Sequence, residues 1–70
     1  MSTQRDPRRD PRPGDRLLKI TKFGTQRREV LDRVPESVCW ITGPQPEYSR
    51  IQSWRAWARN ATVLHTAPEE

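Results

Sequence analysis

The stretch of sequence that decides the fold is Ser37-Val38-Cys39-Trp40-Ile41-Thr42. It is almost wholly apolar, and a short apolar run bounded by turn residues is typical of a buried strand. The turn residues Pro35-Glu36 precede it, and Gly43-Pro44-Gln45-Pro46 follows it as a loop, because two prolines so close together interrupt both helices and sheet ladders. We therefore expect residues 37–42 to form the central and most buried strand of a small sheet.

Two further strands are predicted on the N-terminal side of this run. Residues 17–23 alternate loosely between apolar and polar side chains, which is typical of a half-buried strand entered from the turn at residues 13–15. Residues 24–26 are predicted to turn the chain. Residues 28–34 then form a second strand with weaker alternation.

The C-terminal side of the run predicts a short strand, a short helix and a last strand. Residues 47–51 form the fourth strand, residues 52–60 a helix of about two turns, and residues 61–65 the fifth strand. Arg55 and Arg59 form an i, i+4 pair on one side of this helix. The apolar side is made by residues at helical spacing, namely Trp54, Trp57, Ala58 and Ala61.

The N-terminal residues contain a tandem tetrapeptide, Arg5-Asp6-Pro7-Arg8 and Arg9-Asp10-Pro11-Arg12. Its prolines and its lack of apolar residues argue against helix and sheet. A basic arm of this kind could contact phosphates, but its aspartates cancel much of the charge, so we interpret it as a solvated tail. The predicted organisation is a disordered arm at 1–12, a small β-barrel domain at 13–65 and a disordered tail at 66–70.

The order of these elements resembles that of a Src-homology-3-like small barrel, in which a short helix bridges the last two strands. The opening at residues 13–17, combined with residues 28–31 and 54–61, also resembles small uncharacterised proteins encoded by bacteriophages and prophages. The resemblance covers residues 11–64. It implies a mainly β fold, a five-stranded Src-homology-3-like barrel with one short helix before the last strand, and an origin in a phage or prophage. It implies no activity.

Composition and charge limit the classes of partner but do not identify a single class. The 70 residues make one domain with a formal net charge of +4, 31% apolar residues and a mean hydropathy of -1.05. Residues 17–64 carry eight Lys or Arg against four acidic residues, so most of the excess positive charge belongs to the predicted barrel. Such a surface attracts nucleic acid, anionic lipid or an acidic protein patch. No leader and no apolar stretch of about 20 residues is seen, so we expect a protein of the cytoplasm, inside the host cell if it is phage-encoded.

The residues that could carry chemistry are few. Cys39 is the single cysteine and His65 the single histidine, which leaves no internal disulfide and no zinc site within the chain. Cys39 lies in the most apolar run, where a thiol has little thiolate, and no glycine-rich phosphate loop is present. We therefore expect a binding protein, not an enzyme, with no cofactor, no metal, no small-molecule substrate and no membrane contact.

Aromatic and basic side chains remain as the recognition chemistry. Tyr48, Phe23 and one of Trp40, Trp54 and Trp57 are candidates for a surface on which nucleic-acid bases stack. A protein this small needs its large aromatics inside, so we expect Trp40, Trp54 and Phe23 to be core residues, and Trp57 and Tyr48 to be the more exposed aromatics. A protein partner is favoured, because the arm is charge-balanced and the basic residues are spread over several elements; nucleic acid is the alternative. The protein is expected to be a monomer or a weak dimer. The predicted partner-binding residues are Tyr48, Arg50, Arg55, Trp57, Arg59, Lys22 and Arg28.

Overall fold

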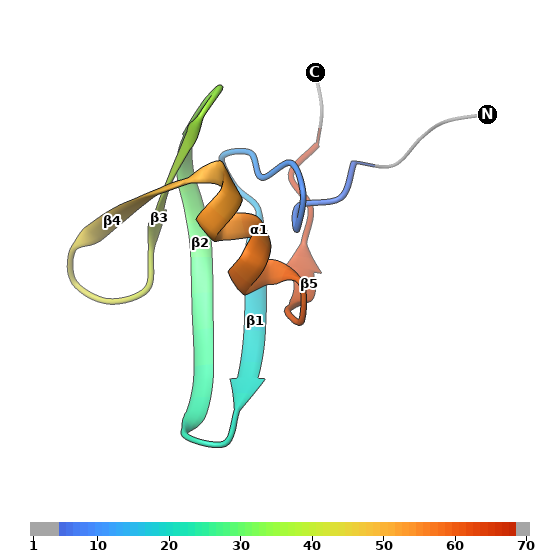
Figure 1. Ribbon diagram of the computed structural model, residues 1–70, viewed down its shortest axis with the longest axis vertical. Helices are drawn as coiled ribbons and strands as arrows, with labels where there is room; N and C mark the ends of the chain where they lie inside the picture. Colours follow the sequence, from blue (N-terminus) through green and yellow to red (C-terminus); the bar gives the residue numbers. More distant parts are fainter. Residues whose placement is uncertain (1–4, 69–70) are drawn as a thin grey trace.

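The computed structural model describes residues 5–68 as one antiparallel sheet with one short helix (Figure 1). The elements are β1 (Arg16–Thr21), β2 (Gly24–Val34), β3 (Ser37–Ile41), β4 (Pro46–Arg50), α1 (Ile51–Ala58) and β5 (Thr62–His65). The predictions of a mainly β fold, of five strands and of one short helix before the last strand are confirmed.

The five strands form an open sheet in the order β4-β3-β2-β1-β5. β4 and β5 are its edges and do not pair with each other, so the sheet does not close into a barrel. The prediction that residues 37–42 form the central strand is wrong, because the 11-residue β2 occupies the centre. β3 is nevertheless the strand with the most buried residues, since it carries Val38, Cys39 and Trp40.

The β1–β2 hairpin turns at Lys22 and Phe23, two residues earlier than the predicted turn at residues 24–26. Thr21 explains the difference, because its hydroxyl accepts a hydrogen bond from the Phe23 amide at 3.2 Å and donates one to the Gly24 carbonyl at 2.9 Å. Gly24 has φ of 129°, a conformation that residues with a Cβ rarely adopt. The loop therefore closes over two residues, and β2 begins at once.

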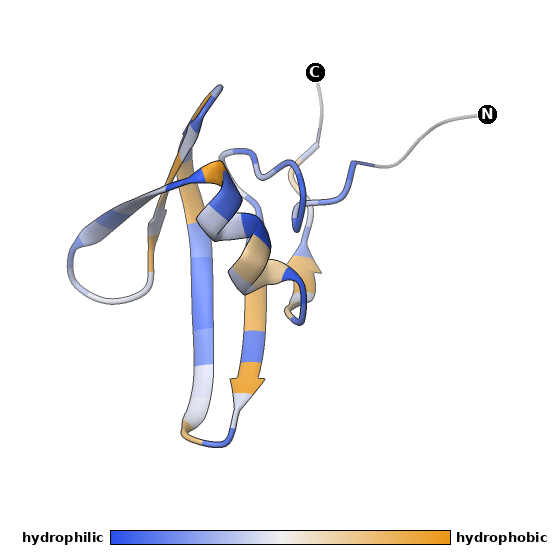
Figure 2. Ribbon diagram, in the orientation of Figure 1, coloured by the Kyte–Doolittle hydropathy of each residue, from blue (hydrophilic) through white to orange (hydrophobic). Residues whose placement is uncertain are grey.

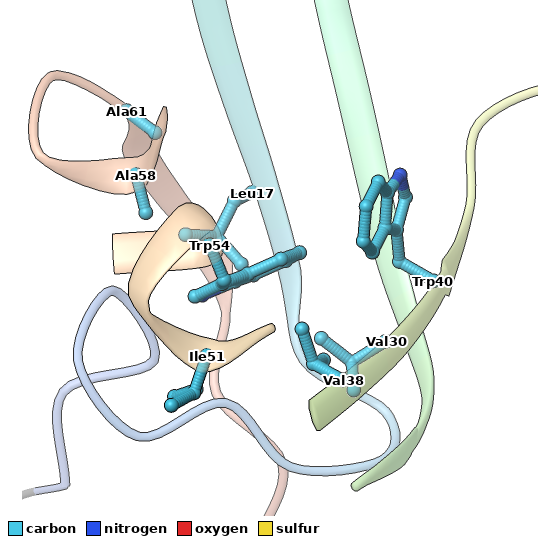
Figure 3. Close-up of a cluster of buried hydrophobic side chains, with 8 residues drawn as sticks. All are labelled: Leu17, Val30, Val38, Trp40, Ile51, Trp54, Ala58 and Ala61. Atoms are coloured by element: carbon cyan, nitrogen blue, oxygen red, sulfur yellow. The ribbon is translucent and has the colours of Figure 1, made fainter. Parts of the chain in front are cut away.

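The core lies between α1 and one face of the sheet (Figure 3). Trp54 of α1 is fully buried, and its ring centroid lies 5.7 Å from that of Trp40 on β3. Each large apolar side chain buried in this way contributes about 1.5–3 kcal/mol of transfer free energy. The predicted core positions of Trp40 and Trp54 are confirmed. The buried cluster consists of Leu17, Val30, Val38, Trp40, Ile51, Trp54, Ala58 and Ala61.

Residues 5–12, for which we predicted disorder, follow an irregular path against α1 (Figures 1 and 2). They are almost entirely hydrophilic and form no helix or strand. Contacts with α1 hold them in place, because the Trp54 indole Nε1 donates to the Pro7 carbonyl at 3.1 Å and the Arg55 Nε donates to the Arg9 carbonyl at 2.8 Å. Pro7 and Pro11 are buried. The structure thus differs from the prediction over residues 5–12, and residues 1–4 lie outside the described part of the chain.

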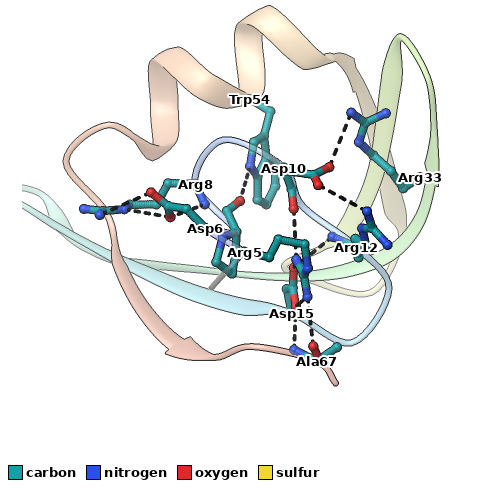
Figure 4. Close-up of polar contacts among 10 residues, drawn as sticks. Arg5, Asp6, Arg8, Asp10, Arg12, Asp15, Arg33, Trp54 and Ala67 are labelled. Carbon is teal, nitrogen blue, oxygen red and sulfur yellow. Dashed lines mark hydrogen bonds and ion pairs between the residues drawn. The ribbon is translucent and has the colours of Figure 1, made fainter. Parts of the chain in front are cut away.

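A buried ion pair joins this segment to the C-terminal residues (Figure 4). The Arg5 guanidinium makes two contacts with the Asp15 carboxylate, one of them at 2.9 Å, and both side chains are at least 96% buried. Asp15 also accepts from the backbone amides of Arg12 at 2.8 Å and Ala67 at 2.6 Å, while Arg5 donates to the Ala67 carbonyl at 2.9 Å. Residues 66–68 of the predicted disordered tail are therefore tied to the fold, and residues 69–70 lie outside the described part.

Candidate functional site

Four arginines gather where the N-terminal segment meets α1. Arg8 and Arg9 from the segment and Arg55 and Arg59 from the helix line an open hollow of about 400 Å³, together with one carboxylate, Asp6. The lining therefore carries a formal charge of +3. We call Arg8, Arg9, Arg55 and Arg59 the arginine cluster.

The positions of these arginines follow from local structure. Arg55 and Arg59 are one helical turn apart, as their i, i+4 spacing predicts, and Arg59 begins the turn that ends α1. Arg55 is held by its hydrogen bond to the Arg9 carbonyl. Arg8 pairs with Asp6 at 3.2 Å. Burial raises the pKa of Asp6, but its hydrogen bonds with Arg8 and the charges of Arg8 and Arg9 outweigh this and leave the pKa below its ordinary value.

Arg28 is packed between two tryptophan rings beside the arginine-bearing helix. Its guanidinium carbon lies 4.2 Å from the ring centroid of Trp40 and 4.0 Å from that of Trp57. Burial lowers the pKa of Arg28, and the charge of Glu47 raises it in part. We predicted Arg28 as a partner contact, but cation–π interactions with two rings already engage its guanidinium.

Trp57 connects α1 to the β1–β2 hairpin. Its indole Nε1 donates to the Gln26 side-chain oxygen at 2.9 Å, and its backbone carbonyl accepts from Lys19 Nζ at 3.2 Å. The ring is half-buried, between the predicted exposed position and a core position. The helix that carries Arg55 and Arg59 is therefore braced against the hairpin.

The tip of this hairpin presents Phe23 to solvent. Its side chain is 90% exposed, so the prediction that Phe23 is a core residue is wrong; the early turn places it in the loop and not on a strand. Lys22, a predicted contact residue, lies with its Nζ 5.2 Å from the Phe23 ring centroid. Ile20, on the neighbouring strand, is also exposed.

The remaining predicted residues, Tyr48 and Arg50, lie on the edge strand β4. Tyr48 is 76% exposed and faces Cys39 across the strand pair, where a hydrogen bond with the Cys39 side chain and its charge raise the pKa of Tyr48. Tyr48 also lines a shallow hollow with Val34 and Cys39. Arg50 lines a different hollow beside Glu36.

The seven predicted residues therefore fall into separate places. Arg55 and Arg59 are brought together, Arg28 and Trp57 stack on each other, and Lys22 lies at the hairpin tip. Sequence reasoning missed Arg8 and Arg9. The only sequence signal for them is the tandem tetrapeptide, and nothing in it indicates that the segment docks on a helix.

The chain matches no protein-family model, no curated protein and no solved structure. The similarity to Src-homology-3-like barrels and to phage proteins therefore stays a prediction. Among residues 5–68, no cluster of His, Cys, Asp and Glu could hold a metal ion. The only helix described is too short and too polar to cross a bilayer.

Proposed function

We propose that the protein is a non-enzymatic binding module whose partner is nucleic acid. The observation that supports this proposal is the arginine cluster, in which four guanidinium groups from two distant segments surround one hollow with a single carboxylate. The sequence favoured a protein partner because the arm was charge-balanced. Asp10, however, pairs with Arg12 and approaches Arg33, so one arm carboxylate lies away from the arginine cluster.

Arginine suits this role because its planar guanidinium binds phosphate oxygens through paired hydrogen bonds. Each phosphate neutralised on a single strand releases counterions, so the logarithm of the binding constant falls with the logarithm of salt concentration by about 0.7 per contact. Because Arg8 is paired with Asp6, three contacts, from Arg9, Arg55 and Arg59, predict a slope of about -2. The exposed position of Arg9 and Arg59 leaves their guanidinium groups accessible to such phosphates.

A non-enzymatic role fits the placement of the reactive side chains. Cys39 is buried on β3, whereas His65 lies at the end of β5, and β2 and β1 lie between these two strands in the sheet. An acyl- or phosphoryl-transfer site needs a nucleophile and a base within hydrogen-bond reach. These two side chains lie on strands separated by β2 and β1 and do not form such a pair.

The test is fluorescence anisotropy of a labelled mixed-sequence single-stranded oligonucleotide, titrated with protein at several salt concentrations. The double variant Arg9→Glu/Arg59→Glu should lose at least tenfold in affinity at low salt, and its salt slope should fall to about -0.7. The matched control is Arg50→Glu/Arg16→Glu, which changes the net charge equally on exposed residues outside the cluster and outside the arm. Equal losses in both variants would show that net charge alone, and not the arginine cluster, governs binding.

We also propose that the fold is a variant of the Src-homology-3-like small barrel. The strand order and the position of α1 support this, because α1 connects the two edge strands β4 and β5 along the chain, as the short helix of such barrels connects the last two strands. A phage or prophage origin, and a site of action in the host cytoplasm, belong to the same proposal.

A protein partner is the second candidate, and the surface around Tyr48 favours it. Tyr48 is 76% exposed and Val34 is 51% exposed, and both line the hollow over Cys39 on the edge of the sheet. Tyrosine is enriched among interface residues that dominate binding energy. A host or phage protein bound here should be retained by Arg9→Glu/Arg59→Glu and lost by Tyr48→Ala in a pull-down with purified partner; the reverse pattern would eliminate this candidate.

A further inference from the structure

The β1–β2 hairpin is free of acidic residues from its first residue, Arg16, through its tip to Arg28 on β2. Residues 16–28 contain five Lys or Arg and no Asp or Glu. The first carboxylate in the hairpin is Glu29, opposite Arg16 at the base. The tip and middle of the hairpin therefore present only positive charge, which is complementary to a phosphate backbone.

An aromatic ring stands at the end of this basic hairpin. Two-residue loops usually carry Gly, Asn or Asp, whose small polar side chains suit the turn geometry, but here the second loop residue is Phe23. Its 90% exposure means that it contributes almost nothing to the core. The two hydrogen bonds of Thr21 fix the turn, so the ring is held at the tip by a defined backbone.

We infer that Phe23 is a base-stacking residue, and that the nucleic acid bound by this protein is single-stranded. The inference rests on the proposed function. The flat face of the ring can stack on an unpaired base, while Lys22 lies beside it and Arg27 is exposed farther along β2, opposite Leu18, for the flanking phosphates. In a duplex the base faces are already stacked, and insertion of Phe23 would first have to unstack a base step.

The hairpin and the arginine cluster belong to one rigid arrangement. Lys19 and Gln26 of the hairpin bond to Trp57 of α1, and the same helix carries Arg55 and Arg59. The base contact at Phe23 is therefore held at a fixed distance from the phosphate contacts on the helix. A strand that reaches both gains affinity from the second contact without a further ordering cost.

The test compares two labelled single strands of equal length, one of normal nucleotides and one of abasic residues that keeps the phosphates but lacks the bases. In anisotropy titrations at low salt, the native protein should bind the normal strand more tightly than the abasic strand. Phe23→Ala and Phe23→Leu should weaken binding of the normal strand by roughly 5- to 150-fold and leave binding of the abasic strand unchanged. Phe23→Trp should retain affinity. Because Phe23 is exposed, thermal unfolding followed by circular dichroism should be the same for all four proteins.

The outcomes separate this inference from the proposed function. Equal binding of normal and abasic strands by the native protein would overturn the stacking role and leave the arginine cluster as a phosphate site. Absence of binding to either strand at low salt would overturn both proposals. The last measurement is binding to vesicles that contain anionic lipid. If Phe23→Ala loses vesicle binding but retains its affinity for the normal strand, the hairpin tip is a membrane contact and the stacking role is wrong.

Discussion

The two copies of the tetrapeptide, Arg5-Asp6-Pro7-Arg8 and Arg9-Asp10-Pro11-Arg12, have the same sequence and form the same local ion pair. In each copy the aspartate pairs with the arginine two positions later, at 3.2 Å and 3.4 Å, and the proline is buried. The first arginine of each copy differs in its burial. Arg5 is buried against Asp15, whereas Arg9 is exposed in the arginine cluster. An arginine in the same tetrapeptide is therefore buried or accessible according to whether its tertiary neighbours include a buried carboxylate.

The largest effect on stability is expected when the buried arginine, Arg5, is removed. Arg5→Ala leaves the Asp15 carboxylate buried without its cation, and breaking a buried pair from one side costs about 3–5 kcal/mol. The expected free energy of unfolding of a 70-residue protein is only about 4–10 kcal/mol. We therefore expect urea unfolding, followed by tryptophan fluorescence, to shift strongly. Arg9→Ala should change stability by less than about 0.5 kcal/mol. Equal effects would show that residue 5 is not held as described.

The same ion pair predicts an acid-sensitive fold. Burial raises the pKa of Asp15. Hydrogen bonds from Arg5, Ala67 and Arg12 and the charge of Arg5 lower this pKa by more than burial raises it, so the pKa lies below the ordinary 3.8. A carboxyl with a depressed pKa in the folded state stabilises the fold above its unfolded pKa, and this contribution is lost as pH falls through the folded value. Unfolding free energy should therefore decline below about pH 4. The Asp15→Asn variant should be less stable at pH 7 and should show a flatter acid profile; an unchanged profile would exclude Asp15 as the titrating group.

The strand and helix pattern was readable from the sequence, and the tertiary contacts of polar residues were not. The apolar run at Val38-Cys39-Trp40 and the helical spacing of Trp54 and Ala58 led to the right elements, because periodicity reports which face is buried. The arm was misjudged because its order depends on a buried indole that needs a carbonyl acceptor, a requirement that no local pattern reveals.

Only half of the candidate site could be predicted from the sequence, for a related reason. Arg55 and Arg59 are predicted neighbours by helical spacing, but Arg8 and Arg9 join them only through the docking of the arm. Phe23 looked like a core residue because the strand pattern continued through it, and the hydrogen bonds of Thr21 decided otherwise. The exposure of a residue near a hairpin depends on which residues form the turn, and the shift of this turn by two residues moves Phe23 from a buried to an exposed position.

A second pair of arginines that differ in burial lies on β2, where Arg27 and Arg28 are adjacent. Arg28 is stacked between Trp40 and Trp57, whereas Arg27 is exposed. Arg28→Ala should destabilise by about 1–2 kcal/mol through the lost cation–π contacts and change the tryptophan emission spectrum. Arg27→Ala should change neither quantity. The measurement is urea unfolding with full emission spectra; an unaltered spectrum in Arg28→Ala would argue against the stack.

The smallest stability effects, and the most informative for function, are expected at Arg9 and Arg12. Both lie in the second tetrapeptide and are exposed, but Arg12 pairs with Asp10 while Arg9 lines the hollow with Arg55 and Arg59. Arg9→Ala should reduce the salt slope of oligonucleotide binding by about 0.7, which is the contribution of one phosphate contact on a single strand. Arg12→Ala should leave the slope unchanged, although both variants lower the net charge by one. Because the two variants match in charge and in stability, a difference between them reports position alone, and equal slopes would reduce the arm to a source of general positive charge.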